Sequence, residues 1–166
     1  YDKHPVREGA PYIENAMDEA WHLMSHNFKT LYDRHLKDYQ NIFNRVAFKL
    51  GGAAFNTELP TDQMLHNYGL KPAHDKYLET LYFQYGRYLL ISSSRTPGVP
   101  ANLQGLWNEH KWAPWRGNYT ININLEENYW PSDVANISQT FAPLASFTQN
   151  LAATGSRNAW NYYGIG

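Results

Sequence analysis

Helical spacing of apolar residues is the feature that most constrains the fold of this 166-residue chain. In residues 13–24, apolar side chains recur three or four positions apart and would line one face of a helix. This stripe consists of Ile13, Ala16, Met17, Ala20, Trp21 and Met24. Similar stripes follow in residues 28–46, 78–89 and 141–151. The sequence therefore predicts an all-α chain built from helical hairpins.

Capping and breaking residues predict where several of these helices begin and end. Ser25 or Asn27 can cap the second helix, and the glycine pair at 51–52 is expected to end it. Near the end of the chain, Gly155 is expected to end one helix and Ser156 to begin another.

The middle of the chain predicts a short helix followed by a long one. Thr61 or Asp62 can start the short helix, which would end near Gly69. The long helix is expected to begin around Asp75. Its predicted apolar face consists of Leu78, Leu81, Tyr82, Tyr85 and Leu89.

Residues 92–131 interrupt this helical pattern. Prolines and glycines punctuate the segment, among them Pro97, Gly98, Pro100, Gly105, Pro114 and Gly117. A loop of this length in a compact domain is usually functional or disordered, and this one is too rich in Leu, Trp and Ile to be disordered. The segment is therefore where a functional site is expected, with Arg95, Asn102 and Gln104 tying down the loop backbone.

Composition argues against several classes of function. The net charge of −1 gives no basic field for nucleic acid or an anionic membrane. The chain has no cysteine, no apolar run near the roughly 18 residues of a membrane span, and no signal-peptide pattern. His22 and His26 have the spacing of metal ligands on a helix, but no third ligand accompanies them. Neither a metal nor a cofactor is expected.

The stretch "YTININLEENYWP", residues 119–131, alternates polar and apolar residues. In an extended backbone, alternate side chains share a face. The polar face would carry Thr120, Asn122, Asn124, Glu126 and Asn128, opposite Ile121, Ile123 and Leu125. A solvated edge strand explains the alternation by itself. However, asparagine is depleted in strands, so its repetition suggests that these amides have partners.

Such amides can assist hydrolysis. If a carboxylate accepts a hydrogen bond from the amide NH2 group, the amide oxygen becomes more electron-rich and its orientation is fixed. The amide could then position an attacking water and help to take its proton, while a separate acid protonates the leaving group.

Three motifs resemble glycoside hydrolase family 95, the inverting α-L-fucosidases and their relatives. They are "LYFQYGRYLLISSSR" (residues 81–95), "PANLQGLWN" (100–108) and "NINLEENYWP" (122–131). The shorter "LPTD" (59–62) and "HLKDYQNIFNRV" (35–46) fit as well, so that the resemblance covers residues 28–164. It implies a fragment of an (α/α)6 barrel, in which residues 1–166 form one partial domain and residues 92–131 enter the active site.

The resemblance also implies roles for individual residues. Asn124 would hold and activate the water, and Asn122 would assist it. The polarising Asp and the acid Glu would lie further along the family sequence than the end of this chain. Thr120 stands where the fucosidases often have His, a position associated with acceptance of α-L-galactosides. Residue 127 also departs from the family, with Glu in place of the usual Met.

Several aromatic residues of the loop are candidates to bind the sugar. Trp107, Trp112, Trp115 and Trp130 could stack on sugar rings or pack the loop onto the helices. We expect one or two of them near the substrate, with Trp107 and Trp130 as candidates. Asn128 is the further candidate for substrate binding.

The leading hypothesis is a fragment of an exo-acting α-L-fucosidase or α-L-galactosidase. Its partners would be a glycan substrate and the remainder of the barrel, and its location periplasmic or secreted in a bacterium. The alternative is a non-catalytic helical domain that binds carbohydrate or protein through its Trp-rich loop. Because the chain begins at Tyr1 without Met and stops at "NYYGIG", we expect a piece of something larger. Such a piece would be inactive alone and would self-associate through uncovered apolar faces.

Overall fold

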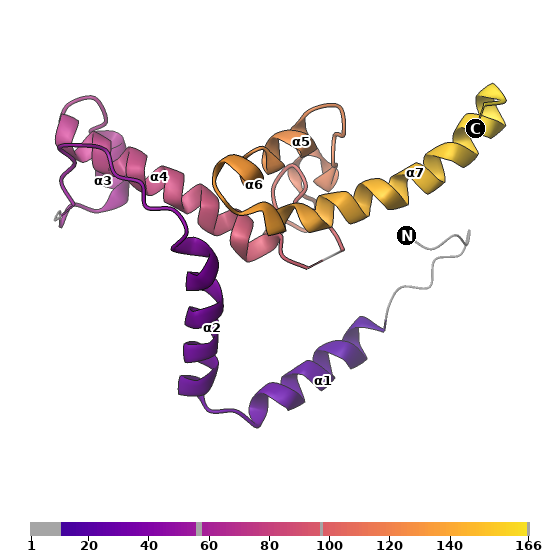
Figure 1. Ribbon diagram of the computed structural model, residues 1–166, viewed down its shortest axis with the longest axis horizontal. Coiled ribbons are helices and arrows are strands. Elements are labelled where there is room, and N and C mark those ends of the chain that lie inside the picture. Colours follow the sequence, from indigo (N-terminus) through magenta and orange to yellow (C-terminus); the bar gives the residue numbers. More distant parts are fainter. Residues whose placement is uncertain (1–10, 56–57, 97, 166) are drawn as a thin grey trace. The chain divides into compact units, whose positions relative to one another are not determined.

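The computed structural model describes residues 11–55, 58–96 and 98–165, and all regular structure within them is helical (Figure 1). The elements are α1 (Tyr12–Met24), α2 (Phe28–Phe43), α3 (Thr61–His66), α4 (Pro72–Ser93), the 3-10 turn η1 (Pro114–Gly117), α5 (Asn124–Tyr129), α6 (Pro131–Val134), the 3-10 turn η2 (Ser138–Phe141) and α7 (Ala142–Tyr163). The prediction of an all-α chain is therefore confirmed. No helix among these residues is long and apolar enough to cross a membrane.

The chain divides into two compact units. One contains the residues up to Asn41 together with those from Ala153 onward, and the other consists of residues 42–152. The single partial domain expected over residues 1–166 stays a prediction. The three long sequence motifs all lie in the second unit.

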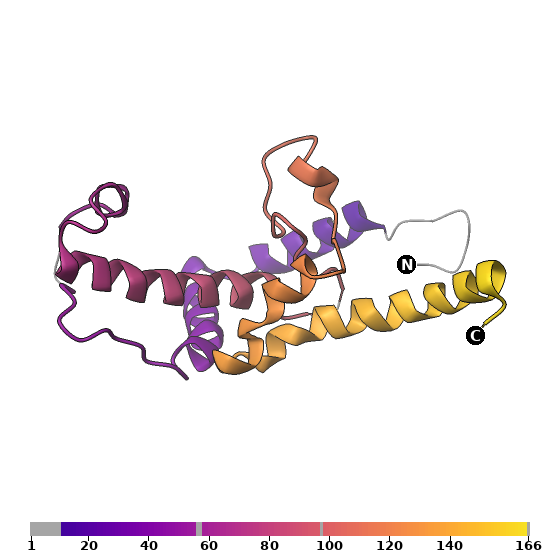
Figure 2. The same ribbon diagram turned by 90° about the horizontal axis from the view of Figure 1, so that it is seen from above.

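The second unit is built around the C-terminal half of α4. Leu90 and Ile91 of α4 are buried, as are Leu144 and Phe147 of α7. Both views place α5 and α6 beside the first turns of α7 (Figures 1 and 2). The edge of the Phe141 ring meets Tyr129 of α5, with centroids 6.4 Å apart.

Arg87 of α4 is a buried charged residue at the centre of this unit, with 2% of its surface exposed. Its Nε donates to the carbonyl oxygen of Ala135 (3.1 Å), and its Nη1 donates to that of Phe43 (2.9 Å) and to Gln84 (2.8 Å). Its guanidinium carbon also lies 5.1 Å from the Phe43 ring centroid. Arg87 thus joins the end of α2, α4 and the segment after α6 through one side chain.

The predicted helix boundaries are confirmed in some places. The first predicted helix is α1, and Asn27 caps α2, because its Oδ1 accepts from the backbone N–H of Thr30 (2.8 Å). Thr61 begins α3 as predicted.

The predicted ends of two helices are wrong. Helix α2 ends at Phe43 and not at the glycine pair, because Arg87 captures the carbonyl oxygen of Phe43. Helix α7 continues through Gly155 to Tyr163. One internal glycine costs only about 1 kcal/mol relative to alanine, which the surrounding helix-forming residues offset.

The predicted apolar face of α4 is confirmed only in part. Leu78 is buried as predicted, but Tyr82, Tyr85 and Leu89 are exposed, and the helix also buries Thr80, Arg87, Leu90 and Ile91. The unit packs on the side that carries Arg87, because the guanidinium hydrogen-bonds carbonyl oxygens of two other segments and these bonds offset the cost of burying its charge. Leu78, Leu81, Tyr82 and Tyr85 instead line an apolar groove of about 650 Å³ with residues of α3 and the turn that follows it. Beside this groove, a hydrogen bond from Tyr68 to Glu79 (2.6 Å) and the charge of that carboxylate raise the pKa of Tyr68.

The apolar stripe of α1 forms as predicted but is exposed. Met17, Trp21 and Met24 expose 56%, 66% and 74% of their surface, and α1 has no buried residue. We therefore expect the 166-residue chain alone to self-associate or to be only marginally stable, because water is a poor solvent for such a face. Sedimentation velocity should show oligomers that Met17→Glu/Trp21→Glu dissociates. A stable monomer that unfolds cooperatively would contradict this expectation.

Candidate functional site

The segment that carries the two asparagines is not extended, so this part of the sequence prediction is wrong. Residues 121–123 form a turn, and Asn124 begins the helix α5. Ile121 and Ile123 of the predicted apolar face are exposed, whereas Leu125 and Tyr129 are buried. The buried apolar face of the segment is therefore the side of α5 that carries Leu125 and Tyr129, which are one helical turn apart.

Local chemistry explains the helix. Glu126 and Glu127 lie in the first turn of α5, where negative charge interacts favourably with the helix dipole. Pro131 begins α6, where a missing N–H is tolerated. In an alternating pattern, residues of the same kind also recur at every fourth position. Because four positions make about one helical turn, the same pattern is compatible with a helix.

Thr120 and Asn124 nevertheless come together at a cavity of about 430 Å³. Four further residues line it: Leu103, Gln104, Pro114 and Trp115. Asn124 is half-buried and supplies an amide, Thr120 supplies a hydroxyl, and Trp115 supplies an aromatic surface. A small apolar-walled cavity with a few polar groups is typical of a site for one sugar ring.

Three residues at or next to this cavity have left-handed backbone conformations. The φ angles are 56° at Trp115, 58° at Arg116 and 49° at Thr120. This conformation is costly for any residue with a Cβ and most of all for a β-branched threonine. Strained backbone of this kind concentrates at functional sites.

Hydrogen bonds hold Thr120 in this conformation. Its N–H points to Oδ1 of Asn118 at 3.4 Å, and its carbonyl oxygen accepts from the N–H of Leu125 at 3.3 Å. The ring of Tyr119 lies 4.7 Å, centroid to centroid, from that of Phe147. The residues that lead into α5 are thus held by contacts both before and after Thr120.

The loop before Thr120 is held by side chains, as predicted for Asn102 and Gln104. Oδ1 of Asn102 accepts from the N–H of Gln104 (3.0 Å), and Nε2 of Gln104 donates to the carbonyl oxygen of Pro114. The carbonyl oxygen of Asn118 accepts from the N–H of Leu103 at 3.3 Å. The bonds from Gln104 to Pro114 and from Leu103 to Asn118 join the two arms of the loop next to the cavity.

Helix α5 fixes the start of the same loop. Nδ2 of Asn128 donates to the carbonyl oxygens of Ala101 (3.3 Å) and Asn102 (3.0 Å). The hydroxyl of Tyr129 accepts from the N–H of Ala101 (2.7 Å) and lies 3.0 Å from Oγ of Ser94. The amide NH2 of Asn128 is therefore engaged with the loop backbone, and its substrate-binding role stays a prediction.

The remaining predicted site residues do not line this cavity. Asn122, Trp107 and Trp130 are all exposed. Their roles stay predictions. The sequence reasoning did not select Trp115 above the other tryptophans. The signal that could have singled it out is its position directly after Pro114, a residue that favours a turn.

His22 and His26 are neighbours at the C-terminal end of α1. Their ring centroids are 5.4 Å apart, and Nδ1 of His26 lies 3.0 Å from Oγ of Ser25. Within the described parts of the chain, no three His, Cys, Asp or Glu side chains are grouped so that they could hold a metal ion.

Comparisons with known proteins bear on this geometry. Residues 27–166 match the model of the glycosyl hydrolase family 95 catalytic domain. An Arabidopsis thaliana protein named "Alpha-L-fucosidase 2" is 42% identical over 162 residues, which is 96% of this chain and 19% of that protein. Proteins named "Probable alpha-fucosidase A" from Aspergillus niger and Aspergillus oryzae are 36% and 34% identical, each over 93% of this chain.

The chain spans about a fifth of the length of these curated relatives. The family match contains all three long motifs as well as the cavity with Thr120 and Asn124. The chain therefore belongs to glycosyl hydrolase family 95 and forms part of its catalytic domain.

Proposed function

We propose that this chain is part of a longer, exo-acting glycosidase that hydrolyses terminal α-L-fucosides or α-L-galactosides with inversion. Family membership and the printed names of the relatives support the hydrolase and the fucoside. The inverting course and the L-galactoside rest on the sequence resemblance. The observation that carries the proposal is the cavity shared by Thr120 and Asn124.

In this proposal Asn124 binds the attacking water. Its amide oxygen accepts a hydrogen bond from the water, and its NH2 group donates to a carboxylate that increases the basicity of that oxygen. Asn122 assists from the turn before α5. An inverting reaction also needs an acid on the opposite side of the sugar, with room for the water between acid and base. We assign the carboxylate and the acid to parts of the enzyme outside these 166 residues.

A comparison of two proteins tests this proposal. The protein expressed from the complete gene should hydrolyse nitrophenyl α-L-fucoside or α-L-galactoside, and NMR should show the β-anomer forming first. The 166-residue chain should show no turnover, because it lacks the acid and the polarising carboxylate. Turnover by the purified chain would mean that the catalytic groups lie within it. An inactive complete protein would contradict the glycosidase assignment.

A substitution at Thr120 tests the specificity. L-Fucose is 6-deoxy-L-galactose, so a residue facing C6 can accept or reject a hydroxymethyl group. In the complete enzyme, Thr120→His should lower kcat/KM for the L-galactoside by roughly tenfold to two-hundredfold, the range for one small group in a pocket. Activity on the fucoside should be kept or improved. Equal losses on both substrates would show that Thr120 does not face C6.

The second candidate function is carbohydrate or protein binding without catalysis. The observation that favours it is the exposure of Trp107, Trp112, Trp115 and Trp130. A complete protein that binds a fucosylated glycan without hydrolysing it would support this function. Cleavage that depends on Asn124 would exclude it.

A further inference from the structure

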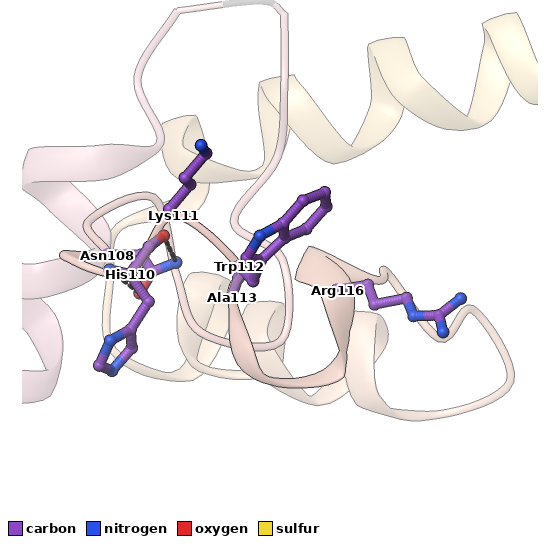
Figure 3. Close-up of a pocket in the computed structure, with 6 residues that line it drawn as sticks. All are labelled: Asn108, His110, Lys111, Trp112, Ala113 and Arg116. Atoms are coloured by element: carbon purple, nitrogen blue, oxygen red, sulfur yellow. Dashed lines mark hydrogen bonds between the residues drawn. The ribbon is translucent and has the colours of Figure 1, made fainter.

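A second cavity, of about 640 Å³, lies beside the one that contains Thr120 and Asn124. It is lined by Asn108, His110, Lys111, Trp112, Ala113 and Arg116 (Figure 3). Ala113 and Arg116 face this cavity, while the two residues between them, Pro114 and Trp115, line the first. The η1 turn is therefore the wall that the two cavities share.

The lining of this cavity is basic. Lys111 and Arg116 are among its lining residues and no acidic residue is, although the chain as a whole has a net charge of −1. Figure 3 shows Trp112 between Lys111 and Arg116, whose side chains extend in different directions. Trp112 is 84% exposed, so its ring is available to a ligand.

The backbone around the cavity is fixed. Oδ1 of Asn108 accepts from the N–H of His110 (3.1 Å), and Nδ2 of Asn108 points to the carbonyl oxygen of His110 (3.3 Å). The N–H of Arg116 donates to the carbonyl oxygen of Ala113 (2.9 Å). With φ at 58°, Arg116 follows Trp115 in a left-handed conformation, which is costly for a residue with a Cβ.

We propose that this cavity binds a sulfate or carboxylate group on the saccharide that precedes the terminal sugar, so that acidic glycans are the preferred substrates. Arg116 would bind either group with two parallel N–H donors, and the charge of Lys111 on the other side of Trp112 would add longer-range attraction. Trp112 offers a flat surface to the apolar face of the same sugar ring. The shared η1 turn places this ring next to the terminal sugar. The inference rests on the proposed function only for the identity of the terminal sugar.

Direct binding tests this inference separately from catalysis. The protein expressed from the complete gene would carry Asn124→Ala, so that ligands are not consumed, and Kd would be measured by calorimetry. The probes are an α-L-fucosyl-galactose disaccharide, its galactose 6-sulfate, and the matching fucosyl-galacturonic acid. Comparison of the last two distinguishes a sulfate from a carboxylate as the preferred group.

The acidic disaccharide that fits should bind about tenfold more tightly than the neutral one, as expected for two largely exposed ion pairs. High salt should reduce this ratio of the acidic to the neutral disaccharide's affinity. Lys111→Met/Arg116→Met should bring the ratio close to one. Lys37→Met/Lys71→Met removes the same charge at exposed positions outside the cavity, and this control should leave the ratio unchanged.

Two results would overturn the inference. One is equal affinity for neutral and acidic disaccharides in the parent protein. The other is a ratio that falls equally in both double variants, which would show that net charge and not this cavity is responsible. Failure of the proposed function gives a different result, because none of the fucosyl disaccharides would then bind.

Discussion

Replacing Asn124 with alanine in the complete enzyme should lower kcat by about 10²–10⁴-fold on fucoside and L-galactoside alike. That range is the usual contribution of a positioned acid–base group, and the water at Asn124 attacks both sugars in the same way. KM should change much less, because the amide acts on the water more than on the sugar. Steady-state kinetics with both nitrophenyl glycosides would measure the two parameters.

Two controls make this result specific. Asn44→Ala removes an exposed asparagine of the same unit and should leave kcat unchanged. The melting temperature of the Asn124→Ala enzyme should match that of the parent, since the start of α5 has no side-chain capping hydrogen bond to lose. A loss confined to one substrate, or one that appears mainly in KM, would assign Asn124 to sugar binding and not to the water.

Replacing Arg87 with methionine should produce the largest loss of stability. Methionine keeps much of the side-chain volume but leaves the buried carbonyl oxygens of Phe43 and Ala135 without these donors. We expect a cost on the order of 3 kcal/mol in the free energy of opening of residues 42–152. Hydrogen exchange of the slowest amides in α4 should then be roughly a hundredfold faster.

Two further variants separate hydrogen bonding from charge. Arg87→Lys keeps the charge but cannot reproduce three separate donor directions, so it should recover only part of the loss. Arg157→Met, at an exposed position of α7, should leave exchange in α4 unchanged. Unaltered exchange in the Arg87→Met protein would mean that the buried guanidinium does not hold this unit together.

The sequence predicted local features of the fold better than long-range ones. The helix over residues 12–24 and the cap at Asn27 depend on neighbouring residues and are confirmed. The end of α2 depends on Arg87, which is 44 positions away from Phe43, so no local pattern could reveal it. The buried side of α4 follows from the same contact.

The candidate site illustrates a second reason for error. Thr120, Asn124 and Asn128 are four positions apart, and so are Ile121, Leu125 and Tyr129. This spacing fits both one face of a strand and one side of a helix, so the alternation cannot distinguish the two. Either conformation can bring residues at this spacing to one side, and Thr120 and Asn124 do line the same cavity, while their joint role stays a prediction. Asn122, halfway between them, shares their side only in a strand, so its assisting role stays a prediction without the extended geometry that suggested it.

The bond between Leu103 and Asn118 has an evolutionary consequence. It closes residues 103–118 at their base, while Asn128 and Tyr129 fix the chain just before it. A loop whose ends are pinned can change in length at little cost, since closure entropy grows only slowly with the number of residues. Residues 104–117, which contribute to both cavities, can therefore differ in length between related proteins while the helices around them stay the same.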